Sequence, residues 1–191
     1  MTPLLIRVGV WTWLIAAVLA GHFGLLRRVP MPAVQAILFG LTAIVLLLSF
    51  RLRALRAWLD ALDIRSLVAL HFTRFVGIYF LVLYRRGELP YEFAVPGGWG
   101  DIAVATLALV VVFVPMNARL GRRAIGIWNA MGLVDILLVV FTAARIGFAR
   151  PWLMLPLTEL PLSLLPTFLV PLIIATHVLI HVRLRREYAP A

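Results

Sequence analysis

Six long apolar runs fill most of this sequence, and they constrain its fold more than any other feature. A helix needs about 20 mostly apolar residues to cross the hydrocarbon of a bilayer, with a usable range of about 17 to 25. Runs of this kind occur at residues 3–20, 32–50, 67–84, 102–116, 127–148 and 164–182, of which the fourth is short and could extend through its polar flanks. The sequence therefore predicts an all-α transmembrane helix bundle of about six spans, forming a single integral membrane domain over residues 1–191.

The composition agrees with a chain whose main partner is the lipid bilayer. Hydrophobic residues make up 63% of the chain and charged residues only 14%, outside the range of soluble domains. The mean hydropathy of +1.03 also lies outside the range of soluble domains. Cysteine is absent, which excludes disulfides, thiolate chemistry and cysteine-ligated zinc or iron–sulfur sites.

The basic residues indicate orientation in a membrane rather than nucleic-acid binding. The net charge is +10, but all 18 basic residues are arginines, and most lie in short clusters between the apolar runs. Eleven fall on the side where the chain begins and five on the other side. Because cytoplasmic loops carry the excess of positive charge, we expect both termini in the cytoplasm of a bacterium, with the spans in its inner (plasma) membrane. The first run could instead be a signal peptide, since "AAVLA" precedes Gly21.

Three connecting segments have distinctive sequences. Residues 51–66 alternate apolar and charged side chains at helical spacing, typical of a helix at the membrane interface or of an extension of the third span. "GELPYEFAVPGGWGD" predicts a shaped outer loop ending in Asp101 as N-cap of the fourth span. "PWLMLPLTELPLSLLP" contains too many prolines for a regular helix and predicts an interfacial or re-entrant segment.

The outer segments also carry acidic side chains. Glu88, Glu92 and Asp101, with His22, are candidate acid–base groups for a lipid substrate, but the favoured interpretation is that they are ordinary interfacial loop residues. Glu159, the only charge of the last outer segment, is a further outer-loop candidate. No H-E-x-x-H, G-x-S-x-G or Walker A pattern is present. The sequence therefore favours a protein that is not an enzyme.

Two stretches in the second half form a recognisable arrangement. "RFVGIYFLVLYRRGELPYEFAVPGGWGDI" is followed by "LPLSLLPTFLVPLIIATH", and together they resemble a family of small, uncharacterised bacterial polytopic inner-membrane proteins over roughly the last two thirds of the chain. The residues that carry this likeness are Arg74, Gly77, Gly87, Leu89, Pro90, Pro96, Gly97, Gly100, Asp101, Pro166, Phe168, Leu169, Val170, Pro171 and His177. The resemblance implies a membrane location and no particular reaction.

Four ionisable residues lie inside the predicted spans at similar depths. An ionisable side chain at the centre of a span costs about 2.5–3.5 kcal/mol on insertion scales, so each one needs a partner or a function. At about 1.5 Å per residue, His71, Arg74, Asp135 and His177 all lie about 6–12 Å from the cytoplasmic boundary. The sequence therefore predicts an intramembrane polar layer contributed by three spans.

This layer is compatible with several roles. In a purely structural protein, Arg74 and Asp135 form a buried ion pair, and the two histidines bond to neighbouring carbonyls or to hydroxyls such as those of Thr73 and Thr176. In a transporter, the layer carries protons or a small solute, and six short spans would form a homo-oligomer to enclose a pathway. In an electron-transfer protein, His71 and His177 ligate haem b. A transition metal could instead bind His177 and His181, spaced i, i+4, with His71 or Asp135.

Overall fold

The computed structural model describes residues 3–113 and 119–188, and these residues form helices without any strand. Six helical segments are long and apolar enough to cross a membrane, namely Leu4–His22, Met31–Arg51, Ile64–Arg85, Tyr91–Phe113, Leu120–Ala149 and Leu165–Arg186. The predicted all-α bundle is confirmed, and its six helices fit a multi-pass membrane protein.

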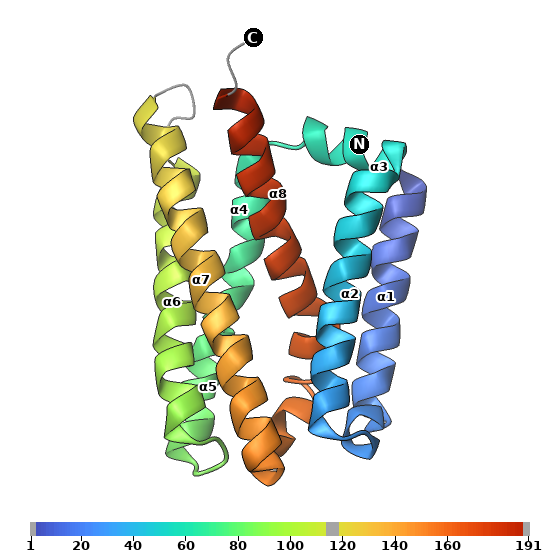
Figure 1. The fold of residues 1–191 in the computed structure, drawn as a ribbon, viewed down its shortest axis with the longest axis vertical. Coiled ribbons are helices and arrows are strands. Elements are labelled where there is room, and N and C mark those ends of the chain that lie inside the picture. Colours follow the sequence, from blue (N-terminus) through green and yellow to red (C-terminus); the bar gives the residue numbers. More distant parts are fainter. Residues whose placement is uncertain (1–2, 114–118, 189–191) are drawn as a thin grey trace. The chain divides into compact units, whose positions relative to one another are not determined.

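The elements follow one another in a simple order (Figure 1). They are α1 (Leu4–His22), η1 (Leu25–Arg28), α2 (Met31–Arg51), α3 (Arg53–Ala61), α4 (Ile64–Ala69), η2 (Leu70–Val76), α5 (Gly77–Arg85), α6 (Tyr91–Phe113), α7 (Arg119–Ala149), η3 (Pro151–Thr158), η4 (Leu165–Leu169) and α8 (Val170–Tyr188). The third span is thus a composite of α4, η2 and α5.

The fourth span begins before residue 102, the start of its apolar run, and the loop predicted there is wrong. The helix α6 begins at Tyr91 and runs through the sequence "PGGWGD", which we expected to be a loop. Proline and glycine are tolerated in a membrane helix because the surrounding helices and hydrocarbon offer its backbone few alternatives to helical hydrogen bonds. The last predicted residues of this span, 114–116, lie outside the described residues.

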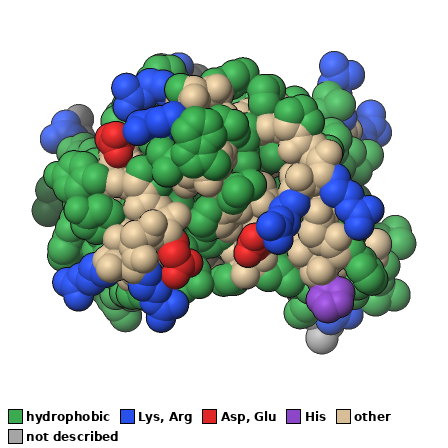
Figure 2. Space-filling model, turned by 90° about the horizontal axis from the view of Figure 1, so that it is seen from below, with side chains coloured by type: hydrophobic (Ala, Val, Ile, Leu, Met, Phe, Trp, Pro, Cys, Tyr) green, Lys and Arg blue, Asp and Glu red, His purple; other side chains and the backbone are tan. Residues whose placement is uncertain are grey.

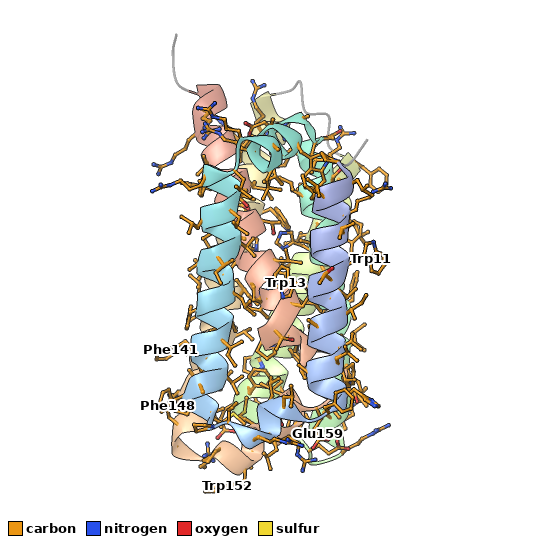
Figure 3. All side chains as sticks on the ribbon, turned by 90° about the vertical axis from the view of Figure 1, so that its right-hand side faces the viewer. Trp11, Trp13, Phe141, Phe148, Trp152 and Glu159 are labelled. Carbon is orange, nitrogen blue, oxygen red and sulfur yellow. The ribbon has the colours of Figure 1, made fainter. Side chains whose placement is uncertain are left out.

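The chain divides into two compact units, of which the first comprises Met1–Ala61 and Ala143–Leu172. In this unit η4 contacts both α1 and α2. Trp13 of α1 points inward, where its indole Nε1 donates to the carbonyl of Thr167 at 2.8 Å, whereas Trp11 points outward (Figure 3). The ring of Trp13 also packs edge-on against Phe168, with centroids 4.7 Å apart. Aromatic packing therefore connects the first helix to η4.

The second unit comprises Leu62–Thr142 and Ile173–Ala191. Its helices α5 and α6 lie side by side (Figure 1). A Cβ added at Gly77 would overlap the carbonyl oxygen of Gly98, and one added at Gly98 would lie 2.8 Å from the carbonyl oxygen of Gly77. The two backbones approach this closely because neither residue has a side chain, as is common between membrane helices.

The short connecting elements account for the segments that were ambiguous from sequence. Within residues 51–66, Arg53–Ala61 form a separate helix, α3. It is followed by a break at which Asp63 caps α4 by accepting from the backbone N–H of Arg65 at 2.9 Å. The proline-rich segment forms the short helices η3 and η4 rather than one regular helix. On the face seen from below, side chains of arginine and of acidic residues lie among largely hydrophobic ones (Figure 2).

Candidate functional site

The segment η2 sets the direction of the two polar residues in the third span. It is a 3₁₀-helix from Leu70 to Val76, so it has about three residues per turn instead of 3.6. Residues i and i+3 therefore lie directly above one another, and His71 and Arg74 have this spacing. Both side chains are fully buried, so this short segment directs an imidazole and a guanidinium into the same interior region.

Arg74 is the centre of the polar contacts in the second unit. Its Nε donates to Oδ1 of Asp101 at 2.6 Å, and its Nη1 donates to the carbonyl of Gly132 at 2.9 Å. Its Nη2 forms a short contact with Oδ2 of Asp135. Since Asp101 belongs to α6 and the other two residues to α7, one guanidinium joins three spans.

Asp101 is therefore not the N-cap that the sequence suggested. It lies well inside α6, and its buried carboxylate is a direct counter-ion of Arg74. The close approach of Gly77 and Gly98 positions it there, because a Cβ at Gly77 would also lie 2.9 Å from the Cβ of Asp101. The glycines that predicted a loop instead bring α6 close enough for Asp101 to reach Arg74.

Two further glycines make room for the side chains of Asp135 and His177. A Cβ at Gly100 would overlap Oδ1 of Asp135, so that carboxylate lies against the bare backbone of α6. A Cβ at Gly132 would lie 2.6 Å from Cε1 and 3.0 Å from Nε2 of His177. Gly132 thus contributes twice, because its carbonyl accepts from Arg74 and its missing side chain admits the imidazole.

The hydrogen bonds of His177 define its tautomer. Asn129 donates from Nδ2 to the backbone carbonyl of His177 at 3.0 Å, which turns its Oδ1 toward the imidazole. Nδ1 of His177 lies 2.9 Å from that oxygen and must therefore donate to it. In the neutral ring, Nε2 is left as a lone-pair acceptor, and this buried atom has no hydrogen-bond partner among the described residues.

His71 shows the same pattern with its nitrogens reversed. The hydroxyl of Thr176 donates to the carbonyl of Ile173 at 2.9 Å, so it accepts from Nε2 of His71 at 3.2 Å. Nδ1 of His71 is then the lone-pair atom, and it too is buried without a hydrogen-bond partner in the described part of the chain. The two imidazole centroids lie 4.2 Å apart. Two unpartnered nitrogens therefore belong to rings that touch.

The geometry of the ring pair does not favour haem or metal ligation. Two imidazoles on opposite sides of one metal ion, each bound at about 2 Å, would have centroids farther apart than the observed 4.2 Å. The rings as they lie leave no space for a macrocycle between them. His181 is exposed, and no group of three or more histidine or acidic side chains within residues 3–113 and 119–188 could hold a metal ion.

The structure brings together His71, Arg74, Asp135 and His177, the four residues of the predicted layer, within the second unit. The outer acidic residues lie elsewhere. Glu92 is in the first turn of α6, Glu88 lies between α5 and α6, and Glu159 forms an exposed ion pair with Arg27 at 3.1 Å in the first unit.

Sequence reasoning missed Asn129 and Trp128 as members of this region. Trp128 packs against His71 and His177, with centroid distances of 4.9 Å and 5.6 Å, and its Nε1 donates to the carbonyl of Val104 at 3.0 Å. An uncharged amide inside a span was a usable signal for Asn129, because a buried amide also requires hydrogen-bond partners. Nothing in the sequence distinguished Trp128 from a residue of the lipid-facing surface.

Comparison with known proteins identifies one matching family. A family model described as a domain of unknown function (DUF8737) matches residues 31–185, a range that contains every residue of the cluster. Neither the curated proteins nor the solved structures include a significant match to the chain.

Proposed function

The chain belongs to the DUF8737 family, and we propose that this member is a multi-pass membrane protein that moves protons through its buried His/Arg/Asp cluster. The cluster consists of His71, Arg74, Asp101, Asp135 and His177. One observation carries the proposal: two imidazoles in contact, each with a buried and unpartnered nitrogen among the described residues, lie beside a guanidinium that has two carboxylates.

The charges of the cluster support proton binding. Arg74 contributes one positive charge and the two aspartates contribute two negative charges, so the ionised cluster with neutral imidazoles has a net charge of −1. A net charge in a low-dielectric interior is costly, and one bound proton removes it. The proton can occupy a carboxylate or either unpartnered imidazole nitrogen.

A purely structural role for Arg74 would require fewer polar partners than the cluster contains. Asp101 alone provides Arg74 with a counter-ion at 2.6 Å, and the carbonyl of Gly132 satisfies a second guanidinium nitrogen. The second carboxylate and the two bare imidazole nitrogens are therefore surplus to the stability of a buried arginine. Surplus acceptors of protons, close together inside a membrane span, are typical of proton relays.

The proposal includes the membrane in which the protein lies and its oligomeric state. The uneven distribution of arginines supports a bacterial inner membrane location with both termini in the cytoplasm. Proton movement coupled to a small solute is consistent with the same cluster. A homo-oligomer in the lipid bilayer would supply the additional walls that a pathway through six helices requires.

The test is proton flux into liposomes that contain the purified protein, driven by a potassium diffusion potential and followed with an internal pH dye. We expect flux in the wild type and only the background of protein-free liposomes in His177→Ala. The matched control is His181→Ala, which removes an exposed imidazole one turn further along α8 and should retain flux. Asp135→Asn should also abolish flux and yet remain folded, because Arg74 keeps Asp101.

A second measurement detects proton binding even in a transporter that moves protons only together with its solute. Infrared difference spectra between two pH values report the carbonyl band of a protonated carboxyl group, and we expect a band that disappears in Asp135→Asn. If the wild type shows neither flux nor this band, and His177→Ala only lowers the melting temperature, the cluster is structural and the proposal is wrong.

A further inference from the structure

Asp135 is the only partly exposed member of the cluster. Its side chain is 24% exposed, whereas that of Asp101 is 4% exposed and that of Arg74 is 0% exposed. His71 and His177 are also fully buried. A proton that enters or leaves the cluster from outside the protein therefore meets Asp135 first.

The exposed part of Asp135 lies beside an apolar surface of α7. The residue lies near the middle of the span Leu120–Ala149. Met131 and Leu138 are exposed apolar residues four positions before it and three positions after it, so they occupy the adjoining face of α7. An apolar face in the middle of a span contacts lipid, and the carboxyl group lies at the edge of that face.

The two aspartates hence have the same chemistry and different surroundings. Asp101 is enclosed and held by Nε of Arg74, so it serves as the permanent counter-ion. Asp135 bonds to Nη2 of Arg74 and rests against Gly100, where the absence of a side chain leaves one carboxylate oxygen beside the bare backbone of α6. An ionised carboxylate at the edge of hydrocarbon is disfavoured, which favours its protonated form.

We infer that Asp135 is the acid through which the cluster exchanges its proton, and that it is a modification site for hydrophobic carbodiimides. This inference rests on the proposed function and names the residue at which the proton enters. In the modification, the carboxyl proton passes to one nitrogen of the carbodiimide and the carboxylate oxygen bonds to its central carbon. The acyl group then migrates to nitrogen, so a stable acylurea forms and no group leaves.

The groups that face this carboxyl group set its pH dependence. They are Arg74 from η2, which favours the ionised form, and Asp101 from α6, which favours the protonated form. The remaining titratable side chains of the cluster are His71 in η2 and His177 in α8. Since only the protonated carboxyl group reacts, labelling should decrease as the pH rises and Asp135 loses its proton.

The experiment treats the protein in liposomes with dicyclohexylcarbodiimide at several pH values and locates the adduct by peptide mass spectrometry. We expect the adduct on Asp135 and not on Asp101, with less adduct at higher pH. A charged, water-soluble carbodiimide should give the opposite pattern, modifying the exposed Asp60 of α3 and sparing Asp135. Gly100→Ala should increase the labelling rate several-fold, because its Cβ displaces the carboxylate from Arg74.

The outcomes separate this inference from the proposed function. Absence of an adduct on Asp135 at every pH, or labelling that does not change with pH, overturns the inference even if His177-dependent flux is present. Labelling of Asp135 that follows pH, in a protein without flux, supports the inference about the exchanging acid and counts against proton transport. Loss of flux in proportion to the adduct supports both.

Discussion

The two units differ in where the hydrogen bonds of their buried polar side chains lead. In the first unit, two buried hydroxyls bond to carbonyls of their own helix: Oγ1 of Thr42 donates to Leu38 at 2.8 Å and Oγ of Ser49 donates to Val45 at 2.7 Å. Such bonds need no other helix and fix no relation between helices. The bond from Trp13 to Thr167 is a cross-helix exception.

In the second unit, the polar side chains reach across helices. Arg74 bonds to α6 and α7, His71 bonds to Thr176 of α8, and Asn129 of α7 bonds to His177 of α8. These bonds are directional, so they define how the spans are rotated and spaced. The comparison shows that intramembrane hydroxyls alone do not identify a site, whereas polar groups with partners on other helices do.

The largest expected effect comes from removing the cation of the cluster. Arg74→Met leaves Asp101 and Asp135 without their counter-ion and should lower the apparent free energy of unfolding by about 3–5 kcal/mol. Denaturation in mixed detergent micelles, followed by tryptophan fluorescence, measures this. Adding Asp101→Asn and Asp135→Asn to the same chain should recover much of the loss, because the unpaired charges are then absent. Wild-type stability in the single variant would show that the polar bonds of the second unit do not hold it together.

A smaller effect tests the close approach of α5 and α6. Gly77→Ala places a Cβ against the backbone of Gly98 and should cost about 1–3 kcal/mol of stability. The matched control is Gly40→Ala in α2 of the first unit, where a Cβ meets no described atom within 4 Å. Helix propensity predicts that this control gains about 0.5–1 kcal/mol. Equal effects in the same denaturation assay would contradict the difference between the units.

The smallest effect concerns the polar connection of the first unit. Trp13→Phe keeps most of the aromatic contact with Phe168 and removes the hydrogen bond to Thr167, so the loss should be about 0.5–1.5 kcal/mol. Unfolding of the variant by the same denaturant measures it. A loss as large as that of Arg74→Met would mean that the first unit also depends on a single polar contact.

Much of the architecture could be predicted because hydrocarbon imposes a length on every span. Five of the predicted spans agree with the observed ones to within a few residues at most of their ends. The fourth was misplaced because Pro96 and the glycines near it are loop formers in water, whereas α6 uses Gly98 to approach α5. Residue type alone does not distinguish a glycine that forms a loop from one that lets two helices approach.

The cluster could be predicted in part for a similar reason. Depth along each helix brings His71, Arg74, Asp135 and His177 to one level, and depth follows directly from sequence position. Asp101 was missed because its depth was counted from a helix start that was wrong. The pairing of each histidine with one particular hydroxyl or amide depends on helix rotation, which the sequence pattern did not define.

The 3₁₀ segment η2 also sets the physical length of the third span. Its seven residues rise about 2.0 Å each instead of about 1.5 Å, so they make the span about 3–4 Å longer than a regular α-helix of the same sequence. Rewinding η2 into an α-helix would shorten the span by that amount and turn His71 and Arg74 about 60° apart. The length of the third span and the alignment of these two side chains are thereby coupled through one segment of backbone.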